Sequence, residues 1–246
     1  MKLVLLGTAG YHPNERRHTS CLMLPEHGIV LDAGTGFFRV RNHLVTSTLD
    51  IFLTHAHLDH VAGLTFLLNT MWERQMDRIT VYGEADKLAV VREHLLDEWL
   101  FPASLPCRWE PLKIHVPSVA GARVTDFPLE HPGGSVGYRF DWPDRSLAYV
   151  TDTTASPDAK YVEAIQGVDL LIHECNFRDD KEEWAVKTGH SFASAVGQVA
   201  AKAKVKRLIL IHFDPLEEGD DPMGIADVRR YFPSAEIGED EMEVEF

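Results

Sequence analysis

Short apolar runs bounded by polar or glycine-rich turns dominate the hydrophobic pattern of this chain. Such runs lack a helical repeat and are typical of strands buried in a sheet. We therefore expect strands at Lys2–Leu6, Cys21–Leu24, Gly28–Leu31, Asp50–Leu53, Ile79–Tyr82, Trp109–Ile114, Arg123–Leu129, Val136–Phe140, Leu147–Val150, Leu170–Ile172 and Leu208–Ile211. The second and third form a hairpin through the turn Pro25–Gly28.

Helices are predicted between many of these strands. One follows the fourth strand directly, a second has apolar residues at helical spacing, and a third begins at Ser156 with proline at its first position. The first two of these helices are Val61–Leu68 and Lys87–Trp99. Two further helices are expected at Phe192–Ala203 and Asp227–Tyr231. Without an internal repeat or a linker, the pattern predicts one α/β domain over residues 1–246.

Polar residues follow one predicted strand after another. Because ligands in α/β folds bind beyond the carboxyl ends of strands, these residues are expected to share one rim. They are Asp32, His55, Asp152, His173 and His212, with His131 in the loop after Leu129.

The densest group lies in Thr54–His60, directly after a predicted strand. His55 and His57 are two positions apart and can point to one metal ion, whereas Asp59 and His60 can reach a second. Imidazole suits zinc, iron or manganese, and a carboxylate among the ligands favours a hydrolytic site over a structural one.

A site with two metal ions divides the candidate ligands naturally. Taken singly, His131 is typical of a surface residue, Asp152 of a helix cap and His212 of a core histidine. Their joint occurrence after strands favours metal binding. The division is His55, His57 and His131 for one ion, Asp59, His60 and His212 for the other, and Asp152 as the bridge.

Composition limits the other possibilities. The formal net charge of −14 argues weakly against a broad nucleic-acid surface, and no apolar run is long enough to cross a membrane. The apolar N-terminus continues into a glycine turn, which indicates a first strand and no signal peptide. Three scattered cysteines form no visible disulfide framework, which favours a cytosolic protein. The acidic segment Glu236–Phe246 is expected to be a solvated tail or an edge strand.

The motif Thr54–His60, followed by His131, Asp152 and His212, resembles the metallo-β-lactamase superfamily. That resemblance implies a four-layer αββα sandwich, in which two mixed sheets lie face to face with helices outside. Several shorter segments are similar to ribonuclease Z, the tRNA 3′-processing endonuclease. They are Gly7–Gly10 with Pro13–Arg17, His131 with Gly137–Arg139, His173–Phe177 and Gly189–Ser191.

One feature of ribonuclease Z is missing. That family carries a long arm for the tRNA elbow between its Gly-Tyr-Arg strand and the bridging aspartate. Here only residues 140–151 separate Arg139 from Asp152, which predicts a tight hairpin without an arm. Thr151 also replaces the usual glycine, and Phe192 replaces the threonine of the family's His-Ser-Thr motif.

The resemblance implies a phosphodiesterase with two divalent metal ions, zinc or alternatively manganese or iron. Its substrates would be cyclic or small phosphodiesters or RNA 3′ ends, cleaved by a hydroxide shared between the ions. Asp59 would also accept a proton, His190 would be the general acid, and Glu174 would hold the His190 imidazole. Asp32 would orient the histidine loop. Relatives of this kind are commonly homodimers.

Other readings remain open at this stage. The same site suits a thioesterase of the glyoxalase II kind, a lactonase or a β-lactamase. A di-iron oxygen or nitric-oxide reductase with a flavin partner is a redox alternative, and a non-catalytic metal-binding homologue comes from a separate class. Arg16 and Arg17 either contact substrate phosphate or belong to a solvated loop.

Overall fold

The computed structural model describes residues 1–112, 118–217 and 219–246. Its chain divides into two compact units. Unit 1 comprises Met1–Ala120 with Glu239–Glu245, and unit 2 comprises Gly121–Gly238 with Phe246. Each unit contains one sheet and its own apolar core. The single domain over residues 1–246 stays a prediction.

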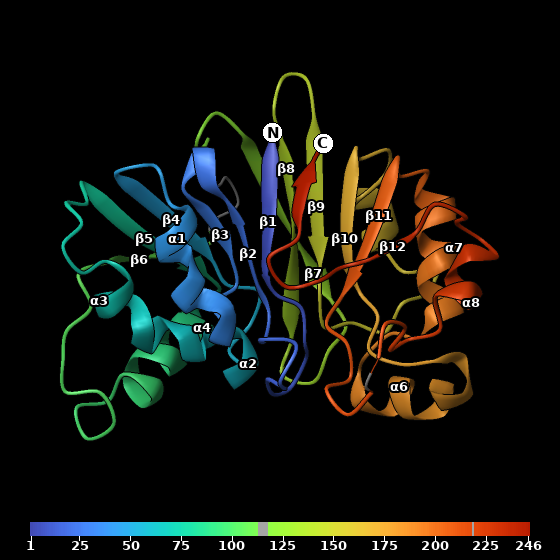
Figure 1. The fold of residues 1–246 in the computed structure, drawn as a ribbon, viewed down its shortest axis with the longest axis horizontal. Coiled ribbons are helices and arrows are strands. Elements are labelled where there is room, and N and C mark those ends of the chain that lie inside the picture. The colour runs from blue at the N-terminus through green and yellow to red at the C-terminus, as the bar shows by residue number, and fades with distance from the viewer. Residues whose placement is uncertain (113–117, 218) are drawn as a thin grey trace. The chain divides into compact units, whose positions relative to one another are not determined.

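Unit 1 is built on a seven-stranded mixed sheet with the order β13-β1-β2-β3-β4-β5-β6 (Figure 1). Strands β1 to β3 are antiparallel neighbours, whereas β3 to β6 run parallel. The carboxyl ends of β3 and β4 therefore lie side by side. The strands are β1 Lys2–Gly7, β2 Cys21–Leu24, β3 Ile29–Leu31, β4 Thr48–Phe52, β5 Arg78–Gly83, β6 Arg108–Pro111 and β13 Glu243–Glu245.

The predicted hairpin of β2 and β3 is confirmed, and its turn explains Gly28. The turn is a 3₁₀ helix at Pro25–His27 that ends at Gly28 with φ +61°. A Cβ atom at this glycine would lie 2.2 Å from the carbonyl oxygen of Thr48. The predicted strand Trp109–Ile114 corresponds to β6, and its residues 113 and 114 lie outside the described residues.

Helices of unit 1 pack on the sheet through a common apolar core. Strand residues such as Val30 and Ile51 meet helix residues such as Val40 and Leu67 there. The helices are α1 Val40–His43, α2 Leu58–Val61, α3 Leu67–Thr70 and α4 Ala85–Val90, with 3₁₀ turns at Thr35–Arg39 and Ala62–Phe66 and a π-helical turn at Val91–Leu95.

The predicted helix Val61–Leu68 is wrong as a continuous element. The chain forms α2, a 3₁₀ turn and α3 instead, because the Gly63 N–H donates to the carbonyl of Ala33, at 2.7 Å, and leaves the helical pattern. A Cβ atom at Gly63 would lie 2.2 Å from the Gly34 carbonyl oxygen. This close approach ties the helix to the turn after β3.

The predicted helix Lys87–Trp99 also ends early. The helical turns stop at Leu95, and Trp99 is 89% exposed. The Asp97 carboxylate accepts the N–H of Trp99 at 2.9 Å, a local bond that competes with helix continuation.

Unit 2 is built on a six-stranded mixed sheet with the order β12-β11-β10-β9-β8-β7. Strands β7 to β9 are antiparallel, and β9 to β12 are parallel. The hairpin of β8 and β9 closes through a bond from the Trp142 N–H to the Arg145 carbonyl, so the predicted tight hairpin between Arg139 and Asp152 is confirmed. The strands are β7 Arg123–Leu129, β8 Ser135–Asp141, β9 Ser146–Val150, β10 Leu170–Glu174, β11 Arg207–Ile211 and β12 Glu236–Ile237.

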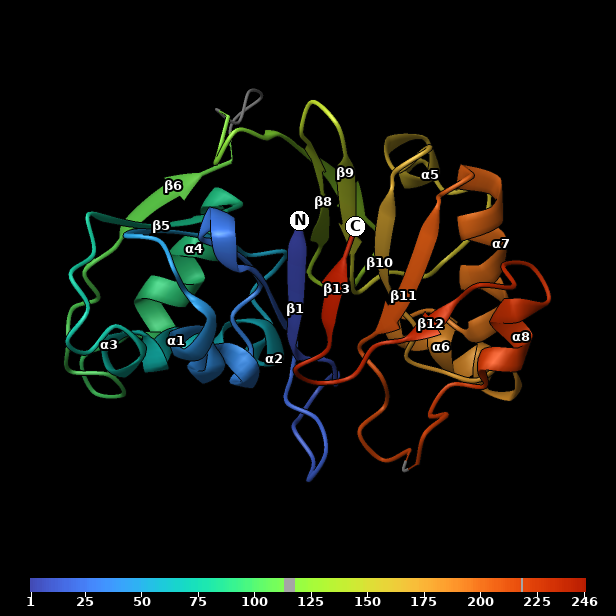
Figure 2. The ribbon, with the colours of Figure 1, turned by 45° about the horizontal axis from the view of Figure 1, so that its top comes forward.

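Helix α7 (Ala193–Ala203) supplies much of the unit 2 core through buried residues such as Val196 and Val199. It packs beside α8 (Ile225–Arg229), as Figure 2 shows. Helix α5 (Tyr161–Ala164) follows the predicted start at Ser156 by several residues, whereas α6 (Glu182–Thr188) was not predicted.

The acidic C-terminal segment forms edge strands. β12 pairs with β11 at one end of the unit 2 sheet, and β13 pairs with β1 at one end of the unit 1 sheet. The edge-strand interpretation is therefore confirmed for both pieces. Because β13 joins the first strand, unit 1 contains residues from both ends of the sequence.

Candidate metal centre

Asp32 supports the histidine loop of unit 1, which comprises Thr54–His60. It follows β3 and is fully buried, next to Thr54 at the end of the parallel neighbour β4. Its carboxylate accepts the backbone N–H of Thr54 at 2.8 Å and the Thr54 hydroxyl at 2.9 Å. It also lies 2.8 Å from Nδ1 of His60. One carboxylate therefore fixes both the backbone of the loop at Thr54 and the imidazole of His60.

This contact determines how His60 can bind a metal. With the Nδ1–H donated to Asp32, Nε2 is left as the ligand atom, and it lies 3.3 Å from Oδ2 of Asp59. A carboxylate behind a histidine is the usual support of a metal-bound imidazole. The ring centroids of His55 and His57 are 4.5 Å apart, and those of His55 and His60 are 4.3 Å apart. The donor set of unit 1 thus fits a divalent metal ion.

In unit 2, Asp152 lies between two imidazoles. Its Oδ2 is 3.5 Å from Nε2 of His131, and its Oδ1 is 3.2 Å from Nε2 of His212. One carboxylate that presents a different oxygen to each histidine has the arrangement of a bridging ligand. The three residues come from the carboxyl ends of β9 and β11 and from the loop after β7.

His131 is held in its neutral form. Its Nδ1 donates to the carbonyl of Gly189 at 2.8 Å, which leaves Nε2 on the side of Asp152. Burial lowers the pKa of His131. The neutral imidazole, which is the form that binds metal ions, is therefore favoured.

Asn176 supports His212 and was missed by the sequence analysis. Its side-chain amide donates to the His212 carbonyl at 2.9 Å and lies 3.3 Å from Nδ1 of the same residue. A single asparagine after a strand carries no signal in the sequence that would distinguish this role.

Three of the strand-end residues adopt the left-handed conformation. The φ angles are +56° for Asp32, +41° for Asp152 and +60° for His212. Side chains other than glycine rarely occupy this region, and such residues are concentrated at functional sites. The chain turns sharply at each of these positions, directly after a strand.

Glu174 and His190 form a pair beside these ligands in unit 2. Oε1 of the fully buried Glu174 lies 3.2 Å from Nδ1 of His190, which is 17% exposed. The two carboxylate oxygens also accept the N–H groups of Thr153 and Ser191, at 2.7 and 3.2 Å. The His190 ring centroid lies 5.3 Å from that of His212, so the imidazole borders the candidate ligands.

His173 is separate from this group. Its Nδ1 donates to the Glu174 carbonyl at 2.7 Å, and its Nε2 lies 3.0 Å from the hydroxyl of Tyr161. Burial lowers the pKa of His173, so the ring is a neutral part of the core. The expectation that His173 joins the polar rim is wrong.

Arg17 does not follow the solvated-loop alternative, whereas Arg16 is exposed in its loop, and contact with substrate phosphate stays a prediction for both. Arg16 binds Glu239 through Nε at 3.2 Å and Nη2 at 2.9 Å, and Arg17 is buried and binds the same carboxylate at 2.8 Å. The neighbouring Asp240 accepts a bond from Arg39 at 2.5 Å. The basic loop of unit 1 is therefore neutralised by the acidic segment before β13.

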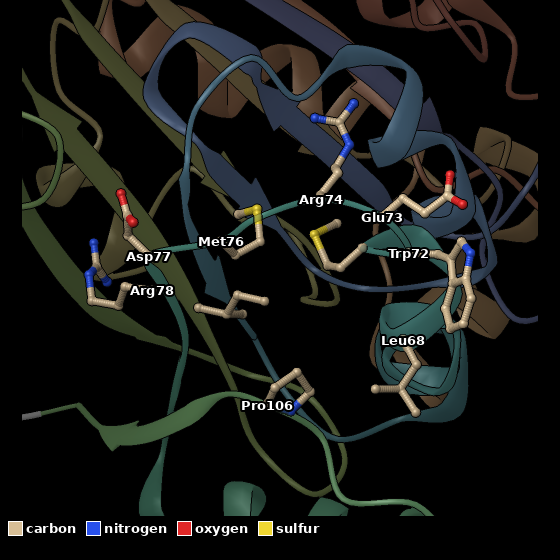
Figure 3. Close-up of a pocket in the computed structure, with 10 residues that line it drawn as sticks. Leu68, Trp72, Glu73, Arg74, Met76, Asp77, Arg78 and Pro106 are labelled. Atoms are coloured by element: carbon tan, nitrogen blue, oxygen red, sulfur yellow. The ribbon is translucent and has the colours of Figure 1, made fainter.

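A separate pocket of about 340 Å³ lies in unit 1 between α3 and β5, and none of its lining residues is a candidate ligand (Figure 3). Its arginines are engaged. Arg74 donates to the carbonyls of Leu44 and Arg41, and Arg78 pairs with Asp50. This pocket does not contribute to the candidate centre.

Residues 27–213 match the family model of the beta-lactamase superfamily domain. That match covers most of the chain. The chain belongs to the metallo-β-lactamase superfamily. The predicted family is therefore confirmed, and the predicted fold class is confirmed as an α/β fold with two mixed sheets and helices.

Relatives and solved structures of this superfamily agree with the match. A ribonuclease Z of Archaeoglobus fulgidus is 27% identical over 304 aligned positions, which cover 99% of this chain and 97% of the relative. The metallo-beta-lactamase fold protein YhfI of Bacillus subtilis aligns with a TM-score of 0.79, at 20% identity and 99% coverage of both chains. The short form of human tRNase Z aligns with a TM-score of 0.78, at 21% identity, over 100% of this chain and 99% of the other.

The alignment with the Archaeoglobus protein is longer than the 246 residues of this chain. The relative therefore carries residues that have no counterpart here. Within the described part of the chain, no helix combines the length and the apolar character needed to cross a membrane.

Proposed function

We propose that this metallo-β-lactamase superfamily protein is a phosphodiesterase that depends on two divalent metal ions. The observation that carries the proposal is the contact of Asp152 with both His131 and His212, beside the pair of Glu174 and His190. The substrates are small or cyclic phosphodiesters or RNA 3′ ends. The predicted enzyme class, a metal-dependent hydrolase, is confirmed by relatives that are ribonucleases Z.

The candidate ligands of both units act together in this proposal. Two ions, zinc or alternatively manganese or iron, would stabilise charge on phosphoryl oxygens and activate water as a nucleophile. The support for ligation is the fixed tautomer of His60 and His131 and the position of Asp152. The assignment is His55, His57 and His131 for one ion, Asp59, His60 and His212 for the other, and Asp152 for both.

His190 acts as the general acid. With its Nδ1–H held by the Glu174 carboxylate, Nε2 is the atom that carries a proton to the leaving oxygen. The negative charge of Glu174 stabilises the protonated ring, and the buried N–H bonds from Thr153 and Ser191 keep that carboxylate in place. Asp59 accepts a proton on the nucleophile side.

The test is a set of variants assayed with bis-p-nitrophenyl phosphate, alongside a thioester and a β-lactam. His190→Ala should retain both metal ions and lose about 10²–10⁴-fold in turnover. Asp152→Ala should lose metal, measured by elemental analysis. Phe38→Ala, an exposed aromatic on another part of the chain, is the control and should change neither quantity.

Two results would contradict the proposal. Full turnover in His190→Ala would remove that residue from the mechanism, and full metal content in Asp152→Ala would remove the bridge. Turnover of only the thioester or the lactam would indicate another hydrolase of the same superfamily.

Location and assembly are further parts of the proposal. Cys21 and Cys175 are buried and free, which supports a reducing compartment such as the cytosol. The homodimer is proposed from the resemblance to ribonuclease Z alone, and sedimentation analysis tests it.

A further inference from the structure

Tyr11 has an unusual backbone conformation and an exposed side chain, and the core of unit 1 requires neither. Its φ angle is +58°, a conformation that bulky residues rarely adopt, and its side chain is 81% exposed. The ring therefore contributes little to the core. The backbone N–H of the same residue donates to Oδ2 of Asp59 at 2.8 Å. The exposed aromatic ring thus belongs to a residue whose backbone N–H is bonded to a candidate metal ligand.

The segment that carries this ring is fixed at both of its ends by Asp240. The Asp240 carboxylate accepts the Thr8 hydroxyl at 2.8 Å and the backbone N–H of His18 at 2.7 Å. Figures 1 and 2 both draw the segment beyond β1 beside α2. That helix includes Asp59 and His60, the last two residues of the histidine loop. The ring is held on an anchored loop beside the centre.

A second ring lies beside Tyr11. The centroid of His12 is 5.4 Å from that of Tyr11, with an angle of 60° between the planes. Nδ1 of His12 lies 2.9 Å from the carbonyl of Pro13 and donates to it, which fixes the orientation of the imidazole. Together the two residues present ordered aromatic surface to the solvent.

The same loop offers no free guanidinium for a substrate, because Arg16 and Arg17 are both bound to Glu239. Recognition by this loop therefore depends on its aromatic surface. Every nucleobase has a π-face, and stacking on an exposed aromatic side chain is the common way in which proteins bind an unpaired base.

We propose that Tyr11 stacks on a base of the substrate next to the scissile phosphate and so selects nucleoside phosphodiesters over diesters without a base. This inference rests on the phosphodiesterase function proposed above. Tyr11 is a specificity-determining residue in this view, and Asp240 and Glu239 hold its loop in position.

The test compares the p-nitrophenyl ester of thymidine 5′-monophosphate with the same ester of abasic deoxyribose 5-phosphate. Both share one leaving group, so the ratio of their kcat/KM values reports the contribution of the base. Stacking predicts a ratio of about tenfold or more for the wild type and a ratio near one for Tyr11→Ala, with the change mainly in KM. Tyr11→Phe should keep the ratio.

Trp99→Ala is the matched control, because Trp99 is a more exposed aromatic of unit 1 that lies outside the loop. It should behave as the wild type. Calorimetric binding of thymidine 5′-monophosphate and of deoxyribose 5-phosphate gives the same comparison without turnover, and only the nucleotide should bind more weakly to Tyr11→Ala.

The outcomes separate the two proposals. Hydrolysis of both esters with the same ratio in the wild type and in Tyr11→Ala would overturn the role of Tyr11 and leave the phosphodiesterase intact. Hydrolysis of neither ester by the metal-loaded wild type would overturn the phosphodiesterase proposal, and the inference with it.

Discussion

At the scale of single residues, Asp32 is expected to influence metal binding without being a ligand itself. It receives bonds from Thr54 and His60 while its own backbone is in the left-handed region. Its charge keeps the proton of His60 on Nδ1 and makes Nε2 a better donor to a metal.

Asp32→Asn isolates that charge, because asparagine tolerates the left-handed conformation at least as well as aspartate. We expect metal affinity to fall about 10–100-fold while the far-ultraviolet circular dichroism stays unchanged. Competition with a chromogenic chelator measures the affinity. Asp77→Asn, which alters an exposed carboxylate bonded to Ser47, is the control. Unchanged affinity in Asp32→Asn would reduce Asp32 to a turn residue.

The strained backbone of Tyr11 gives a prediction about stability. At φ +58° a glycine has no steric penalty, whereas alanine keeps most of it. Tyr11→Gly should therefore have a free energy of unfolding about 1 kcal/mol above that of Tyr11→Ala. Urea denaturation of the two variants, both without the ring, measures the difference. Equal stability would mean that the loop relaxes when the ring is removed.

Candidate metal ligands could be named from the sequence where possible ligands are concentrated. The stretch Thr54–His60 predicts metal binding, because so many possible ligand side chains occur within one loop. The ion pairs of Arg16 and Arg17 could not be predicted because their partner Glu239 lies more than two hundred positions away in the sequence. Pairing of that kind is decided by the fold, and no local pattern contains it.

At the scale of elements, Asp169 connects the starts of three neighbouring strands in unit 2. Its carboxylate accepts the N–H and the hydroxyl of Ser146, each at 2.8 Å, and the ammonium of Lys206 at 2.5 Å. Ser146 begins β9, Asp169 precedes β10 and Lys206 precedes β11. Burial alone would raise the pKa of Asp169, but the bonds from Lys206 and Ser146 outweigh it and lower the pKa.

Because the folded-state pKa of Asp169 lies below the ordinary value of 3.8, its stabilising contribution is present above that value. The contribution is lost as the pH falls through the lowered pKa. Asp169→Asn should be about 2 kcal/mol less stable at neutral pH and lose less stability in acid, so that the two curves converge. Urea denaturation across the acid range measures this.

Asp158→Asn is the control for this experiment, since Asp158 is an exposed carboxylate paired with Lys202 and should change stability little. Parallel pH curves for the wild type and Asp169→Asn would show that the carboxylate is not the titrating group.

Elements were predictable from local pattern, whereas their interruptions were not. Strands such as β7 and helix α7 follow apolar periodicity closely. The break after α2 depends on the approach of Gly63 to the turn after β3, a contact between distant segments. The short helix α6 carries exposed apolar residues such as Trp184, so its pattern does not show a buried face.

At the scale of the whole molecule, the net charge of −14 and the missing arm both predict few contacts with the phosphate backbone of a long RNA. A protein that grips a long RNA backbone releases counterions, and its binding weakens steeply as salt is added. In this chain Arg16, Arg17 and Arg39 are all paired with carboxylates of residues 239–240.

We therefore expect kcat/KM for a dinucleotide to change less than about threefold between about 50 and 200 mM salt, because few phosphates are contacted. A short RNA with a 3′ extension should be cleaved with a similarly shallow dependence. Initial rates at constant pH measure both. A steep decline for the RNA alone would indicate a basic track that the charge balance does not predict.

The return of the chain to β1 also has a consequence for biosynthesis. Residues 239–245 are translated after residues 121–238, yet β1 and the segment around Tyr11 depend on them. A nascent polypeptide therefore exposes the edge of β1 and leaves Arg17 without the Glu239 carboxylate until residues 239–245 have emerged from the ribosome. The segment around Tyr11 therefore takes its final form only after residues 121–238 have been translated.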